Sequence, residues 1–280
     1  MSAPGPSVCS TRRERTDFYV ALPALVFTSV YGQPLGDLLS PALVVGLWLV
    51  VFGTAVVAWY VHRYFSPDSR RGVAVVQSYH TNVGYLGLPL VALTFGEQTT
   101  AVASLVLGIV AVTQLPLTVL LLVSVNDGDV RLRDEVGNLC RNPVLVALLV
   151  GMAASTLNVA VPAAAADGLG ALSELALPIA LLCVGASLPL DVASVNPSAT
   201  GAIVALKLAW MPALAWAVFS ALGVAAQTFV AAVVMLAMPT AVSTFVYAGE
   251  LGGDDQFASV NIFVTTVASL GSLFVLLQLV

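Results

Sequence analysis

Long apolar stretches, interrupted only by short polar segments, constrain this chain more than any other feature. Of its 280 residues, 59% are hydrophobic and only 9% are charged, whereas a soluble domain carries roughly a quarter charged residues. So few charges cannot cover a surface that faces water. Since a helix needs about 20 mostly apolar residues to cross a bilayer, the sequence predicts an all-α polytopic membrane protein.

Nine of the apolar stretches are candidates for membrane-crossing helices. The longest separating segment, 126–142, divides four spans from five. We expect an N-terminal segment at 1–16, a first unit at 17–125, a loop at 126–142 and a second unit at 143–280. The predicted spans are 17–32, 41–64, 73–96, 99–125, 143–160, 167–188, 199–222, 226–248 and 256–280.

The arginines predict how these spans are oriented. Nine of the ten basic residues are arginines. Alternate threading of nine spans puts the N-terminus and the loops at 65–72 and 126–142 on one side, and all nine arginines fall on that side. By the positive-inside rule that side is cytoplasmic. The N-terminus and the acidic 249–255 loop are then predicted to be cytoplasmic, and the C-terminus to lie outside the plasma membrane.

Two proline-containing segments recur at nearly the same separation. An Ala-Leu-Pro run at Pro23 recurs at Pro178, 155 residues later. Pro89 has a counterpart in Pro239, 150 residues later. A tandem unit with an odd number of spans inserts with inverted topology, so the sequence predicts two inverted five-helix repeats. The first repeat then lacks its first helix, through a misassigned start or a true loss. A chance match of two Ala- and Leu-rich segments is the alternative.

The segment 77–89 combines polar side chains, glycines and a proline in a stretch that otherwise spans lipid. Proline removes a helix hydrogen bond, which the bilayer tolerates only where protein or water satisfies the freed groups. A broken helix also presents N–H groups and a positive dipole end that suit a carboxylate. The alternative is a pair of ordinary kinked helices. The predicted substrate-binding residues, from this segment and its counterpart, are Asn82, Gly84, Gly87, Pro89, Pro239, Thr240 and Ser243.

Three ionisable residues are candidates for charge support or coupling. Lys207 is the single lysine and lies about eight residues into the span 199–222; an intramembrane charge suggests function, and snorkelling to the surface is the alternative. His80 is either a proton-sensitive residue of the pathway or a neutral histidine bonded to backbone. Glu174 precedes Pro178 by one turn and is either a coupling residue or a charge at the rim.

Motifs for catalysis or metal binding are absent from the sequence. Cys9, Cys140 and Cys183 lack metal-ligand spacing, and the chain contains no zinc-protease, nucleophile-elbow or phosphate-loop motif. No Asp lies deep in a span, as intramembrane proteolysis would require. We therefore expect no enzymatic activity, no metal, no cofactor and no nucleic-acid partner.

Four segments, in order, resemble the auxin efflux carrier family, which includes the plant PIN-formed auxin carriers and bacterial malonate or malate permeases. They are 82–90, 176–188, 206–212 and 237–243.

The resemblance implies ten helices in two inverted repeats, a scaffold domain, a transport domain, and a site where two broken helices cross. Those helices would be 73–96 and 226–248. In the plant carriers an asparagine seven residues before the crossover proline helps to hold the substrate carboxylate, and Asn82 stands at that place before Pro89.

These observations together predict a secondary transporter that moves small carboxylates across the plasma membrane by alternating access. Its partners would be the substrate, the lipid bilayer and, as a candidate, a second copy of the chain. A channel, or a sensor or scaffold that does not transport, is the alternative on the same fold.

Overall fold

The computed structural model describes residues 12–126, 137, 141–176, 178–179, 182 and 196–280. Every regular element within these ranges is a helix, which confirms the all-α prediction. Four helices are long and apolar enough to cross a membrane, and several shorter apolar helices accompany them. The four long ones are Pro41–His62, Glu97–Asn126, Pro197–Ala221 and Asp255–Leu277.

The helices follow the predicted spans closely, with two of the spans broken. The elements before the central loop are α1 (Arg12–Val30), α2 (Leu35–Leu38), α3 (Pro41–His62), α4 (Asp68–Tyr79), the π-helical turn η1 (Val83–Gly87), α5 (Leu88–Thr94) and α6 (Glu97–Asn126). Those after it are α8 (Pro143–Thr156), α9 (Ala163–Glu174), α11 (Pro197–Ala205), the π-helical turn η2 (Leu206–Trp210), α12 (Met211–Ala221), α13 (Ala226–Leu236), α14 (Ser243–Glu250) and α15 (Asp255–Leu277). Most of the predicted span 167–188 beyond α9 lies outside the described residues, as do all three cysteines.

A polar residue followed by proline begins three of these helices. Ser40, Asn142 and Asn196 precede α3, α8 and α11, and each side chain accepts a hydrogen bond from a backbone N–H of the first turn. Proline fits the first turn because its missing N–H would have no partner there. The cap and the proline together fix where each helix starts.

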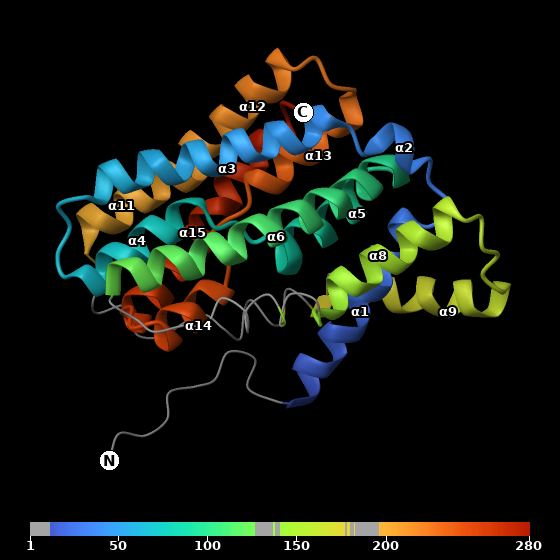
Figure 1. Ribbon diagram of the computed structural model, residues 1–280, viewed down its shortest axis with the longest axis horizontal. Coiled ribbons are helices and arrows are strands. Elements are labelled where there is room, and N and C mark those ends of the chain that lie inside the picture. The colour runs from blue at the N-terminus through green and yellow to red at the C-terminus, as the bar shows by residue number, and fades with distance from the viewer. Residues whose placement is uncertain (1–11, 127–136, 138–140, 177, 180–181, 183–195) are drawn as a thin grey trace.

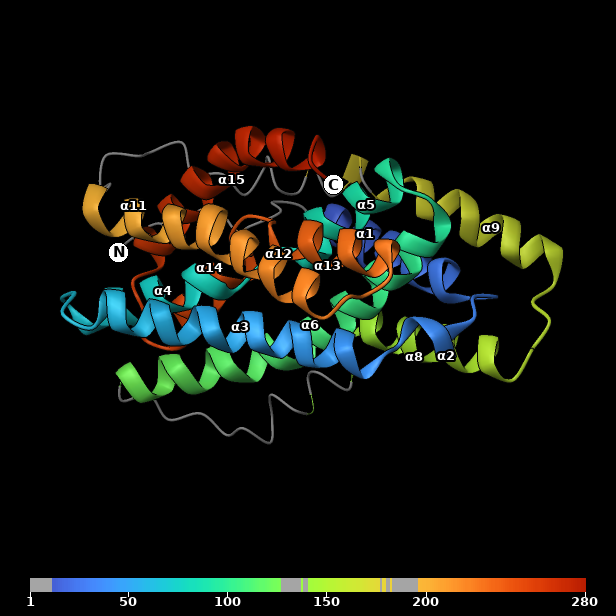
Figure 2. The same ribbon diagram turned by 90° about the horizontal axis from the view of Figure 1, so that it is seen from above.

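The helices form two groups (Figures 1 and 2). α1 packs on α8 and α9, and we call these three the three-helix group. α3 to α6 and α11 to α15, with the two π turns, form the main bundle. Gly151 of α8 lets α1 approach closely, since a Cβ there would lie 2.6 Å from the side chain of Val30. The two groups meet chiefly where α6 contacts α1 and α8, with the Oγ atoms of Ser29 and Ser104 2.6 Å apart.

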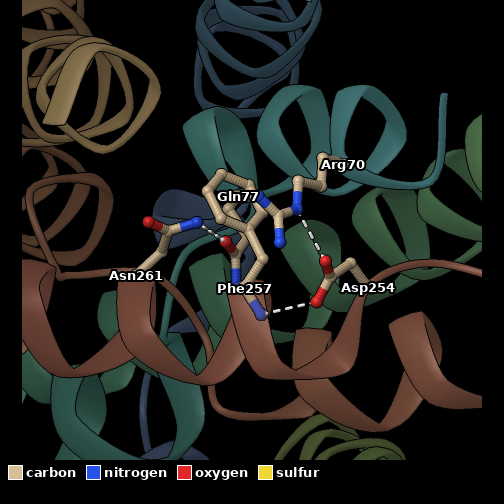
Figure 3. Close-up of polar contacts among 5 residues, drawn as sticks. All are labelled: Arg70, Gln77, Asp254, Phe257 and Asn261. Atoms are coloured by element: carbon tan, nitrogen blue, oxygen red, sulfur yellow. Dashed lines mark hydrogen bonds and ion pairs between the residues drawn. The ribbon is translucent and has the colours of Figure 1, made fainter. Parts of the chain in front are cut away.

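An ion pair joins the first turn of α4 to the residue that caps α15, at one end of the main bundle (Figure 3). Arg70 Nε donates to Asp254 Oδ2 at 2.6 Å, and Asp254 also caps α15 through the N–H of Phe257. The backbone N–H of Asp254 donates to the carbonyl of Ser69. The start of α4, which falls in the predicted 65–72 loop, and the acidic 249–255 segment therefore share one end, as alternate threading requires. Which side of the membrane that end faces stays a prediction.

Candidate substrate site

Two broken helices cross at the centre of the main bundle. α4 is separated from η1 and α5 by residues 80–82, and α13 is separated from α14 by residues 237–242. The breaks pair as a short antiparallel bridge in which Asn82 N–H donates to the Pro239 carbonyl at 2.9 Å and Ala241 N–H donates to the His80 carbonyl at 3.1 Å. Because lipid cannot satisfy free backbone groups, this mutual pairing lets both helices open inside the bundle.

The first break lies upstream of its proline. Pro89 occupies the first turn of α5, and the π turn η1 separates it from the extended residues 80–82. The same order recurs in the second half, where η2 ends two residues before Pro212. A proline ring clashes with the carbonyl four residues back, and a π turn widens the helix at that point. The two π turns thus accommodate prolines that would otherwise interrupt a regular helix.

Side chains from other segments satisfy the carbonyl ends of both half-helices. At the end of α4, the carbonyls of Gln77 and Tyr79 accept from Thr240 Oγ1 and Gln114 Nε2, both at 2.8 Å. At the end of α13, the Leu236 carbonyl accepts from Lys207 Nζ at 3.1 Å. Thr81 Oγ1 donates to the Met238 carbonyl, also at 3.1 Å. The negative dipole ends of the half-helices are therefore occupied by the protein itself.

An amide network ties the crossing to α15 (Figure 3). Asn261 Nδ2 donates to Gln77 Oε1 at 2.9 Å, and Gln77 Nε2 donates to the Ala258 carbonyl at 2.8 Å and to Thr244 Oγ1 at 3.1 Å. Thr200 Oγ1 donates to Asn261 Oδ1 at 2.7 Å. These side chains are buried and hydrogen-bonded to one another, so the network positions α4, α11, α14 and α15 around the crossing.

A cavity of about 230 Å³ lies beside the crossing, between the two helix groups. The start of η1 (82–85), the start of α14 (Ser243) and the start of α8 (Asn142 and Val144) all line it, and α1 closes one wall with Leu22. Helix N-termini carry N–H groups without partners inside the helix and a partial positive charge. The partly positive N-terminal ends of three helices thus line the cavity.

The described residues that line the cavity include polar groups but no Asp, Glu, Lys or Arg. Asn82 is 3% exposed, and its Oδ1 accepts from the N–H of Tyr85, which caps η1. Its amide nitrogen has no hydrogen-bond partner among the described residues and is available to an acceptor in the cavity. His80 Nδ1 lies 2.8 Å from Thr118 Oγ1. These neutral donors and helix ends suit an anion.

Comparison with known proteins identifies the molecule. The family described as "Membrane transport protein" matches residues 15–135 and 135–277, nearly the whole chain. The chain belongs to this family. The resemblance to the auxin efflux carriers is thereby confirmed. A protein of Rhizobium meliloti (strain 1021) named "Putative malonate transporter" is 26% identical over 273 residues, which cover 94% of this chain and 84% of that protein. The chain is therefore a multi-pass membrane transporter of a family that carries organic anions.

The structure brings four of the predicted residues of this transporter together at the cavity and places the others elsewhere. Asn82, Gly84, Ser243 and His80 line the cavity. The remaining residues pack in the core, take part in the crossing or lie at the surface. Gly87 packs against Met235, Pro89 is buried in α5, Pro239 and Thr240 pair with the first break, Lys207 is fully buried against α13, and Glu174 is exposed at the end of α9.

Thr81 and Tyr85, within the segment 77–89, line the cavity without having been predicted as site residues, and sequence reasoning also missed three polar residues outside that segment. Gln114 donates to Tyr79 and accepts from the N–H of Thr81, so it holds the first break open. A glutamine two residues before Pro116, inside an apolar span, was a usable signal. Asn142 was marked by the proline that follows it, which is typical of a helix start. Tyr247 carries no such signal, because a tyrosine near a membrane surface is common.

Proposed function

We propose that this protein is a secondary transporter that carries small carboxylates, malonate among them, across the plasma membrane by alternating access. The observation that supports it most is the cavity, which combines three helix N-termini with the amide of Asn82, whose nitrogen has no hydrogen-bond partner in the described part of the chain. No acidic side chain occurs among the described lining residues. An anion placed there meets the Asn82 amide and the positive dipole ends, and apolar side chains line much of the remaining wall. The name of the Rhizobium relative supports malonate as the first compound to test.

Two opposite walls of the cavity favour a dicarboxylate. One wall is the crossing in the main bundle, with Asn82 at the start of η1, and the other is the start of α8 in the three-helix group, with Asn142. The crossing offers the starts of η1 and α14 to one carboxylate, and α8 offers its start to the other. A substrate with a carboxylate at each end would contact both walls, whereas a monocarboxylate would leave one wall hydrated.

The position of the cavity between the two helix groups supports alternating access. A displacement of the main bundle along the three-helix group would carry the crossing from one end of the molecule towards the other. The interface it would slide on includes small residues, such as Gly108 of α6, against which Leu148 packs, and the Ser29–Ser104 contact. Small side chains allow close approach of membrane helices.

We assign the predicted residues the following roles. Asn82 donates to a carboxylate, and the backbone at Gly84 and Ser243 supplies N–H groups. Lys207 is a positioning residue that keeps the α13 half-helix closed at its carbonyl end. His80 couples transport to protons, since an imidazole beside the bound anion could take up a proton with it.

Uptake of radiolabelled malonate into proteoliposomes tests the proposal. We expect saturable uptake that is accelerated when the vesicles are preloaded with unlabelled malonate, because a carrier returns faster when it is loaded. Flux that does not saturate and shows no such counterflow would indicate a channel. Specific binding without any flux would indicate a sensor, and either result would refute the carrier.

A further inference from the structure

One face of α3 is exposed along its whole length and ends in an arginine. Exposed residues recur every three or four positions, so they form a single stripe on the helix. Most of the stripe is apolar, as expected of a surface that contacts acyl chains. The stripe consists of Val45, Trp48, Leu49, Phe52, Val56, Trp59, Tyr60 and Arg63.

The stripe is hollowed over its first three turns. A groove of about 430 Å³ runs along it from Val45 to Val56. Gly53 contributes no side chain there, and Trp48 and Phe52 border the hollow. All residues that line the groove are apolar or glycine apart from the indole nitrogen of Trp48, which donates to Thr113. The groove is therefore suited to a hydrocarbon chain and not to a polar ligand.

Two arginines at the end of the stripe flank one tryptophan. Arg63 follows Trp59 by one helical turn, and the Arg71 guanidinium of α4 lies 5.9 Å from the centre of the Trp59 ring. Arg63 stacks on Tyr64, with its Cζ 4.6 Å from the ring centre, and Tyr64 is 85% exposed. Aromatic side chains of this kind mark the level of the lipid headgroups.

These two arginines form few ion pairs within the described part of the protein. The Arg71 side chain is 25% exposed, and its one ion-pair contact among the described residues is from Nη1 to the exposed carboxylate of Asp68, at 3.4 Å. Arg70 differs, since it is held by Asp254 at 2.6 Å. Arg63 and Arg71 therefore keep donors available for an external anion, and a phosphate accepts paired guanidinium bonds well.

We propose that an anionic phospholipid binds on this face of α3, with its phosphate between Arg63 and Arg71 and one acyl chain in the groove. The groove and the two arginines lie on the same side of α3, and Val56 at the near end of the groove precedes Arg63 by seven residues, about 10 Å along the helix. An acyl chain spans that distance from a headgroup at the arginines, and this arrangement carries the proposal. A zwitterionic lipid would bring its own ammonium group towards the arginines and bind less well. The site is on the opposite side of α3 from the protein core and does not depend on the transport proposal.

Lipid retention by the purified protein tests this proposal without measuring transport. Protein in detergent is exchanged against equal amounts of phosphatidylglycerol and phosphatidylcholine, and bound lipid is counted by native mass spectrometry. We expect preferential retention of phosphatidylglycerol. Each of Arg63→Gln and Arg71→Gln should weaken it roughly fivefold, as expected for about 1 kcal/mol per basic residue at an anionic surface.

Three controls separate this site from general attraction. Arg141→Gln removes an exposed arginine away from α3 and should leave retention unchanged. Asp68→Asn removes the competing carboxylate and should strengthen retention. Glycerol phosphate, which has no acyl chain, should fail to displace the lipid. Equal retention of the two lipids, equal losses in Arg141→Gln and Arg63→Gln at matched melting temperature, or displacement by glycerol phosphate would each overturn the proposal.

Discussion

Replacement of Asn82 by alanine and by aspartate is expected to separate two roles of one side chain. The Oδ1 atom of Asn82 accepts from the N–H of Tyr85 at 3.2 Å, and its amide nitrogen, which no other described residue contacts by a hydrogen bond, can donate into the cavity. Alanine removes both interactions. Loss of the cap costs about 1 kcal/mol of stability, and loss of a hydrogen bond to a charged substrate costs roughly 1.5–3 kcal/mol of binding. The second figure corresponds to about a 10- to 150-fold higher half-saturation concentration.

Aspartate keeps an acceptor for Tyr85 but places a negative charge beside the bound anion. The Asn82→Asp protein should therefore melt close to the wild-type temperature and transport little malonate. Thermal unfolding in detergent and concentration-dependent uptake in proteoliposomes measure the two effects on the same preparations. If Asn82 only caps η1, alanine lowers the melting temperature with unchanged half-saturation, and aspartate transports normally. That pair of results would refute the reasoning.

Three further substitutions test separate parts of the site. Lys207→Met should slow uptake severely, because the Leu236 carbonyl loses its donor. Lys207→Arg should restore only part of the uptake. Near-normal turnover of the Met variant, at equal protein in the membrane, would contradict the positioning role of Lys207. Gly87→Val should lower the free energy of unfolding by about 1–3 kcal/mol, since a Cβ at this position lies 2.9 Å from Met235 Sδ. Gly271→Val is the control and should not lower it, because the space around Gly271 is open. Equal thermal unfolding of the two variants would contradict the prediction. His80→Gln should abolish a rise in uptake as the pH falls from about 8 to about 5; an unchanged pH profile would exclude His80 as the proton-coupling group.

The helices were predictable from the sequence because apolar length dominates in a membrane. The stretches at α3, α6, α11–α12 and α15 have no competing pattern. The starts of α3, α11 and α15 carry a polar cap, with proline following Ser40 and Asn196. The position of the first break was not predictable in detail. Proline marks a helix interruption, yet Pro89 sits in the first turn of α5, because the π turn η1 accommodates it and moves the opening to residues 80–82.

Site residues next to a helix break could be predicted from the sequence. Site residues that only the packing of distant segments brings together could not. Asn82 and Ser243 could be inferred because they adjoin the breaks, and both line the cavity. Asn142 could not be assigned to the same site, since 60 residues separate it from Asn82 and only the packing of α8 against the main bundle brings them together. The role of Thr240 in the crossing also needed the structure, because its hydroxyl donates to Gln77 from 163 residues away.

At each helix break, the carbonyl end is hydrogen-bonded by the protein and the N–H end faces the cavity. This difference affects how an anion can be released. The carbonyl ends are closed by Thr240, Gln114, Thr81 and the buried amino group of Lys207. The N–H ends open on a cavity with no fixed charge among its described lining residues. A lysine in the cavity would add a strong attraction to the anion, and a ligand held tightly in one state stabilises that state. Because Lys207 bonds to Leu236 instead, the anion would be held by dipoles and neutral amides, which favours the moderate affinity that a transport cycle requires.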